Sequence, residues 1–345
     1  MSGLVVQRFA LGAQWPTADP FLFVAHHHDD YPEGDGRLGP NARLDGRQLG
    51  QDFSGLHGWS MYHGRAVPGF PQHPHRGFET VTYVRTGYVD HADSMGATAR
   101  YGQGDTQWMT AGGGIQHAEM FPLTDTDRPN PLELFQIWVN LPSADKMVDP
   151  YFTMMWRDDI PVVVAKDDEG RRTEVTVVAG RLGDVTPPSP PPNSWASRPE
   201  ADVAIWHISM EPGAVWTLPA AAPGATRVLY AFEGSSVELS DGQRTDQLDA
   251  GVGGAVDPST ALDLRVTEGQ EGIEILVLQG RPIGEPVSRH GPFVMNTFEE
   301  IQQAYLEYQA TGFGGWPWPD PAPHHGPVAR RFAVHADGRR EDAEA

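Results

Sequence analysis

Glycine and proline recur at short intervals along this chain, and this spacing restricts the possible folds more than any other feature of the sequence. The 345 residues include 39 Gly and 31 Pro, which is well above average usage, without a repeat or a low-complexity tract. The stretches between them are short and rich in β-branched and aromatic residues, for example residues 80–84, 134–139, 175–179 and 227–232. Many short strands joined by glycine-rich turns are typical of an all-β sandwich or barrel.

One segment departs from this pattern and predicts an amphipathic α-helix over residues 297–309. Thr297 followed by Glu300 has the spacing of a capping box, and Gly312 lies just past the expected end. Apolar side chains recur at helical spacing at Phe298, Ile301, Tyr305 and Tyr308. The expected fold is therefore all-β with one C-terminal amphipathic helix.

The length of the chain exceeds that of most single hydrophobic cores and favours two domains. The first block of strands ends and a second begins within residues 141–168, so we predict an N-terminal domain over residues 1–155 and a C-terminal domain over 156–345. The second domain would carry the helix and, from residue 337, a frayed and flexible tail.

The charge balance excludes several classes of partner. The chain has 25 Lys and Arg against 46 Asp and Glu, a net charge of −21. Direct binding to nucleic acid or to an anionic membrane is disfavoured, because both need basic side chains. The N-terminus lacks a secretory pattern and no run approaches membrane-spanning length, so we expect a cytoplasmic protein.

The histidines indicate a metal site. His73 and His75, and likewise His117 and Glu119, have i,i+2 spacing, which points both side chains to one face of a strand. Because the chain contains no cysteine, a metal must be held mainly by imidazole nitrogen and carboxylate oxygen. Two such strands side by side would offer three imidazoles and one carboxylate to Fe(II), Mn(II), Ni(II) or Zn(II), with positions left for water or substrate.

The second half of the chain has five histidines but no His-x-His pair, so one metal is expected. Glu79 is the rival carboxylate to Glu119, although a bulge at Gly77 could turn it away and leave it as a hydrogen-bond acceptor behind the ligands.

Two other polar clusters have simpler interpretations. The run from His26 to Asp30 is expected to be a solvated loop, since consecutive histidines alternate faces on a strand and rarely converge. His91 and Asp93 are expected in a turn that the aspartate stabilises.

Longer motifs then point to a known family. The spacing from His73-x-His75 to Gly87, and from Gly104 to His117, resembles the two motifs of the cupin superfamily, with two extra residues in the second. Residues 73–83, 105–120 and 290–297 resemble pirins, and so do the shorter stretches 136–142, 145–147 and 283–286.

This resemblance implies two tandem cupin (double-stranded β-helix) barrels with an iron-type metal only in the first. Carried over, the ligands are His73, His75, His117 and Glu119, with Fe(II) the expected ion and Mn, Ni, Zn and Cu as alternatives. Residues 26–67, 187–200 and those after 314 exceed the usual pirin length and could cover the pocket mouth or an interface.

Three functions follow from this reading. The resemblance implies quercetin 2,3-dioxygenase activity on a flavonol or related aromatic enol with O2, in which Glu119 could accept the substrate hydroxyl proton as a general base. The second is a redox-dependent regulator of a transcription factor or metabolic enzyme, whose partner would present a basic surface to the net charge of −21. The third is a structural, storage-type bicupin whose ligands are absent or idle.

Overall fold

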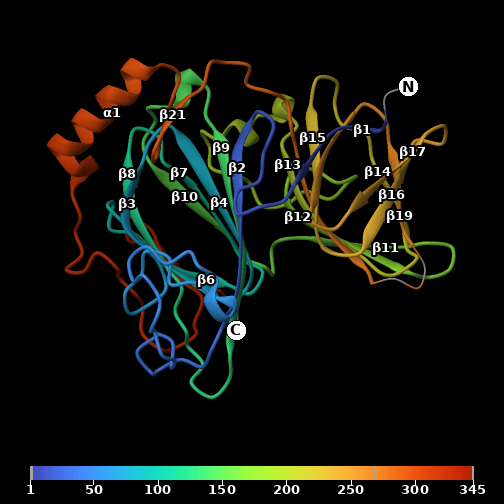
Figure 1. The fold of residues 1–345 in the computed structure, drawn as a ribbon. Coiled ribbons are helices and arrows are strands. Elements are labelled where there is room, and N and C mark those ends of the chain that lie inside the picture. The colour runs from blue at the N-terminus through green and yellow to red at the C-terminus, as the bar shows by residue number, and fades with distance from the viewer. Residues whose placement is uncertain (1–2, 268, 270, 344–345) are drawn as a thin grey trace. The chain divides into compact units, whose positions relative to one another are not determined.

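The computed structural model describes residues 3–267, 269 and 271–343, and β-strands form most of its regular structure (Figure 1). Its contacts divide the chain into two compact units. The first barrel unit contains residues 26–136, 141–157 and those from 285 onward, and the second barrel unit contains residues up to 25, 137–140 and 158–284. The predicted division near residue 155 is therefore too simple, because each end of the chain belongs to the unit built mainly from the other half.

Two sheets form the first barrel unit. One has the order β10-β7-β4-β9-β2, with β2 (Phe21–Tyr31), β4 (Phe78–Thr86), β7 (Thr106–Thr110), β9 (Asn130–Asn140) and β10 (Tyr151–Met155). The other has the order β24-β23-β6-β5-β8-β3, with β3 (Gly69–His75), β5 (Tyr88–Asp93), β6 (Thr98–Gly102), β8 (Ile115–Met120), β23 (Phe332–Val334) and β24 (Arg340–Asp342).

The second barrel unit also contains two sheets. The larger has the order β1-β18-β15-β20-β13-β12-β11, with β1 (Val5–Ala10), β11 (Val162–Lys166), β12 (Arg172–Ala179), β13 (Ala204–Met210), β15 (Thr226–Gly234), β18 (Val252–Val256) and β20 (Ile273–Gly280). The smaller has the order β14-β19-β16-β17, with β14 (Val215–Leu218), β16 (Ser236–Ser240), β17 (Thr245–Asp249) and β19 (Leu262–Val266). The N-terminal strand β1, blue in Figure 1, pairs with β18.

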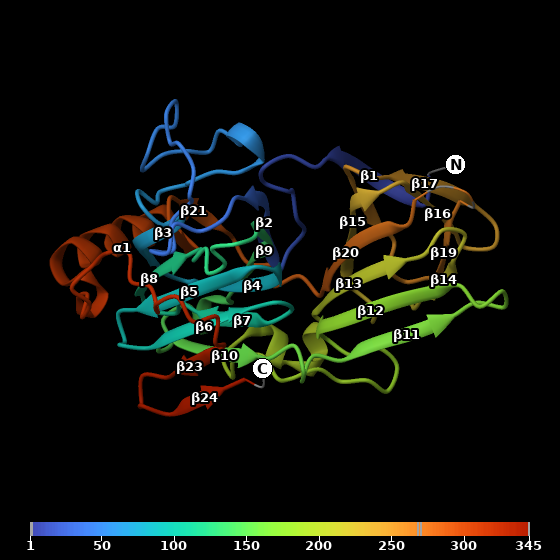
Figure 2. The same ribbon diagram turned by 90° about the horizontal axis from the view of Figure 1, so that it is seen from below.

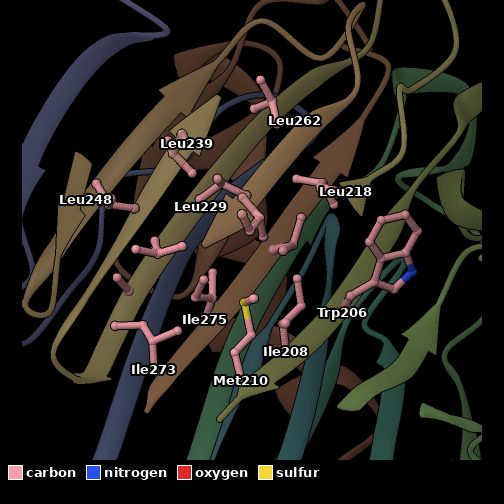
Figure 3. Packing of buried hydrophobic residues seen from close by; sticks show 14 of the residues in the cluster. Trp206, Ile208, Met210, Leu218, Leu229, Leu239, Leu248, Leu262, Ile273 and Ile275 are labelled. Atoms are coloured by element: carbon pink, nitrogen blue, oxygen red, sulfur yellow. The ribbon is translucent and has the colours of Figure 1, made fainter. Parts of the chain in front are cut away.

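Alternating side chains from these strands fill the second barrel with an apolar core (Figure 3). Trp206, Ile208 and Met210 point inward from β13, because every second residue of a strand lies on one face. His207, between them, pairs instead with Glu274. Among the described residues of this barrel, no group of three or more histidine and carboxylate side chains is close enough to share an ion.

The predicted C-terminal helix is confirmed as α1 (Phe298–Thr311), which follows the hairpin β21 (Ser288–His290) and β22 (Phe293–Met295). Thr297 and Glu300 form the expected capping box, and Gly312 ends the helix with a φ of 55°. Ile301 and Ala304 are buried against the apolar side chains of β22. Short 3-10 helices occupy Leu56–Gly58, Ser143–Asp145, Trp195–Ser197, Pro199–Ala201 and Gly312–Gly314.

Two strands after residue 314, β23 and β24, belong to the first barrel unit. Its strand β23 pairs with both β6 and β24, so the expected flexible tail is wrong for residues 340–342 (Figure 2); residues 344–345 of that tail lie outside the described residues. Within the described part of the chain, no helix combines the length and apolar character needed to cross a membrane.

Candidate metal centre

Three histidine side chains converge between β3 and β8. His73 and His75 come from β3, and His117 comes from β8, where it lies directly opposite His73 in the antiparallel ladder. Their ring centroids are 4.4 Å apart for His73 and His117, 4.8 Å for His73 and His75, and 4.9 Å for His75 and His117. One nitrogen of each ring lies within 4.8 Å of the others. The i,i+2 spacing of His73 and His75 therefore does bring both rings to one place.

Hydrogen bonds and burial prepare these rings to bind a cation. Nδ1 of His73 lies 2.8 Å from the carbonyl oxygen of Pro71, and Nδ1 of His75 lies 3.3 Å from that of Pro292. A ring that donates through Nδ1 presents the lone pair of Nε2. Burial lowers the pKa of His73 to about 4, and it lowers the pKa of His75 and His117 as well, with neighbouring imidazoles adding to the effect. The three rings are therefore neutral at physiological pH, as ligation requires.

The ring of His117 shows that these residues fit a metal ion. It is fully buried, and neither of its nitrogens has a hydrogen-bond partner among the described residues. A buried polar atom without a partner costs about 1–3 kcal/mol. Coordination of an ion through one of these nitrogens would satisfy that atom, which supports this cluster as a metal site.

Glu119 lies beside the three histidines but not within their group. Its Oε2 is 3.7 Å from Nε2 of His117 and accepts a hydrogen bond of 2.9 Å from Nε2 of Gln136. Thr82 Oγ1 donates to Oε1 at 3.2 Å. Burial raises the pKa of Glu119, and this rise is opposed by His91 and by the hydrogen bonds from Thr82 and Gln136. Sequence reasoning gave Thr82 and Gln136 no role, although polar residues within buried strands were a signal.

The rival carboxylate, Glu79, is also placed outside the histidine group. It is fully buried on β4, where its Oε1 accepts a hydrogen bond of 2.7 Å from Thr110 Oγ1. Gly77, between β3 and β4, has a φ of 83°, and a Cβ there would lie 2.0 Å from the carbonyl oxygen of Val294. Only glycine fits at this turn.

His91 is a further buried residue near the centre. The prediction of a turn is wrong for His91, which lies on β5 opposite Glu119. Its ring centroid is 5.6 Å from that of His117, and its Nε2 is 3.2 Å from Asp93 Oδ2. Asp93 does stabilise the following turn, since its Oδ1 accepts the backbone N–H groups of Met95 and Ala97.

A row of aromatic rings leads from the centre to solvent. The ring of Phe70 is 6.4 Å from His73 and 5.2 Å from Tyr62, with which it stacks. Phe53 lies 5.4 Å from Tyr62 and is 58% exposed. Two of these rings belong to the segment 26–67, whose unusual length was noted in the sequence.

The run from His26 to Asp30 forms part of β2, so its prediction as a solvated loop is wrong. The ring of His27 contacts Tyr62 and Phe70, whereas His26 and His28 point to the other face and meet Glu133 on β9.

Two cupin-type barrels with a histidine cluster in one of them define a bicupin protein with one buried candidate metal centre. Comparison with protein families agrees with this class. The Pirin family matches residues 5–139, and the Pirin C-terminal cupin domain matches residues 205–314. The chain belongs to the pirin family, as its motifs predicted.

Individual relatives support the same assignment. The chain is 37% identical over 243 residues to a Pseudomonas aeruginosa protein named as a candidate quercetin 2,3-dioxygenase, covering 70% of this chain and 78% of that one. It is 34% identical over 242 residues to human pirin, covering 70% and 76% of the two chains. A crystal structure of quercetin 2,3-dioxygenase from Acinetobacter baumannii matches with a TM-score of 0.68 and 25% identity, covering 90% of this chain and 98% of that chain.

Proposed function

We propose that this protein is a mononuclear metal oxidoreductase of the quercetin 2,3-dioxygenase type, acting on flavonols or related aromatic enols with O2. The observation that carries the proposal is the buried convergence of His73, His75 and His117, with neither nitrogen of His117 in a hydrogen bond among the described residues. The names of a relative and of a structural neighbour support the substrate class.

The proposed ligands are the three histidines and Glu119, and the proposed ion is Fe(II). When bound, such an ion would supply a Lewis acid with redox activity and open positions for a chelating oxygen ligand and O2. Glu119 needs only a modest movement to join the group, since its Oε2 is already 3.7 Å from His117.

The chain's own residues would handle the substrate proton and the substrate ring. Burial raises the pKa of Glu119, which strengthens this carboxylate as a base for the acidic hydroxyl of an enol. Gln136 and Thr82 would hold its two oxygens during that transfer. Phe70 and Tyr62 offer stacked aromatic faces next to His73, against which a planar substrate could pack.

The test is turnover of quercetin by iron-loaded protein. Turnover is measured as O2 uptake and as carbon monoxide release. We expect activity in the wild-type protein and in the His324→Ala control, because His324 is an exposed histidine on the C-terminal segment. His75→Ala should lose both iron and activity. Glu119→Gln should lower kcat more than it raises KM if the carboxylate transfers a proton.

Absence of turnover above the His75→Ala background, in protein shown to hold iron, would refute the dioxygenase proposal. A metal-loaded protein of this kind would then be tested as a redox-dependent regulator, by comparing capture of partners in its reduced and oxidised forms.

A further inference from the structure

A second group of metal-binding side chains lies on strands β2 and β9. His26 and His28 share one face of β2, and Glu133 lies on the neighbouring strand β9. One ligand atom of each lies within 4.8 Å of the others. Among the described residues, only this group and the three histidines of the candidate metal centre meet that criterion.

This group is separate from the candidate metal centre. On β9, Gln136 reaches Glu119 beside that centre. Glu133 is three residues away, and an odd separation along a strand places two side chains on opposite faces. Strand β4 repeats the pattern, because Thr82 bonds Gln136 whereas Arg85 bonds Glu133. Glu133 and Arg85 therefore lie on the face of this sheet opposite to the one from which Gln136 and Thr82 reach Glu119, whereas the three histidines belong to the other sheet.

We propose that His26, His28 and Glu133 form a second metal site, for Zn²⁺ or a divalent ion of similar preference. Two imidazoles and one carboxylate form a ligand set of open zinc sites, which leave a fourth position to water or another ligand. Zinc–ligand bonds of about 2.0–2.2 Å place ligand atoms about 3–4 Å apart. Binding an ion would therefore require the three ligand atoms to move closer together than their present spacing of up to 4.8 Å.

The neighbours of this group already hold two of its members in place. The ring of His26 stacks on buried Phe135, with a centroid separation of 4.6 Å and an interplanar angle of 12°. Arg85 Nη1 donates to Glu133 Oε1 at 2.6 Å, and His26 Nε2 lies 3.0 Å from the same oxygen. Fixed ligands lose less conformational freedom when an ion binds.

The charge of Glu133 also suits a cation. Although burial raises the pKa of this carboxyl group, the hydrogen bond from His26 and the charge of Arg85 lower it to about 2. The group is therefore ionised throughout the physiological range. His28 is exposed and gives an ion access from solvent.

Metal content after equilibrium dialysis against Zn²⁺ tests the proposal. We expect two zinc ions per chain in the wild-type protein and in the His324→Ala control. His28→Ala should bind one, His117→Ala should bind one, and the double variant none. Arg85→Gln, which removes the partner that orients Glu133, should weaken the second site by about 10- to 100-fold.

Circular dichroism and the thermal midpoint would establish that each variant is folded, and His28 is exposed enough for its removal to leave the fold intact. The proposal is overturned if the wild-type protein saturates at one zinc ion that is lost in His117→Ala, or if His28→Ala retains the full zinc content. Neither result depends on quercetin turnover, so this proposal and the proposed function fail independently.

Discussion

Replacing Arg100 with methionine tests whether a buried ion pair holds the C-terminal segment on the first barrel unit. Arg100 Nε and Nη2 each donate to a different oxygen of Asp90 at 2.6 Å, and neither side chain is exposed. Both partners also contact the C-terminal segment: Arg100 donates to the carbonyl oxygen of Val328, and Asp90 accepts the backbone N–H of His325 at 2.9 Å.

Methionine fills much of the arginine volume but leaves the charge of Asp90 buried without its partner. Removing one member of a buried pair costs about 3–5 kcal/mol, and we expect the free energy of unfolding to fall by that amount. Adding Asp90→Asn to Arg100→Met should recover part of the loss, because the unpaired charge is then gone.

Urea unfolding gives the free energies, and hydrogen–deuterium exchange of β23 reports on the C-terminal segment. We expect faster exchange in Arg100→Met, since this strand pairs with β6, which carries Arg100. Arg43→Met is the matched control: Arg43 pairs with Asp45 in solvent, so its removal should change little. A loss below about 1 kcal/mol for Arg100→Met, against the 3–5 kcal/mol expected, or unaltered exchange in β23, would contradict the reasoning.

Three further substitutions test other parts of the fold. Thr297→Ala should lower the stability of α1 by about 1 kcal/mol through loss of the capping box, measured by thermal unfolding, whereas Thr297→Ser should restore most of it. Ile275→Ala, in the core of the second barrel (Figure 3), should cost about 2–5 kcal/mol in urea unfolding; a smaller cost would mean a loosely packed core. The pKa of Glu133 is lowered from 4.5 to about 2 in the folded protein. The ionised carboxylate therefore adds about 3 kcal/mol to the free energy of unfolding above pH 4.5, and this contribution is lost as the pH falls toward 2. Between pH 4.5 and 2, the free energy of unfolding of Glu133→Gln should fall less steeply with pH than that of the wild-type protein. An equal slope in the two proteins would refute the lowered pKa of Glu133.

Local sequence signals were sufficient for the helix and for placing His73 and His75 on one face of a strand. Thr297, Glu300 and Gly312 act within a few residues of one another, so the helix ends could be read from the chain alone. The pair His73 and His75 likewise needs only the alternation of a strand. Grouping His117 with them required the further assumption that two strands 42 residues apart lie side by side, and the resemblance to pirins implied the same set.

Features that depend on pairing between strands far apart in the chain could not be predicted from the sequence. Residues 26–30 have no alternation of apolar and polar side chains, and their strand exists because β2 joins the sheet beside β9. The meeting of His26 and His28 with Glu133 depends on the same pairing. The roles of Thr82 and Gln136 became visible only when their strands were placed around Glu119.

The interleaved path of the chain also bears on its synthesis. Strand β1 can find its partner only after residues 252–256 have left the ribosome, and the first barrel unit lacks β23 and β24 until residue 342 has emerged. Translation must therefore pass residue 280 before the second barrel unit has all its strands, and residue 342 before the first barrel unit has all of its own. A chain cut after residue 155 would leave one fragment with strand β1 separated from β18, and the other with strands β23 and β24 separated from β6.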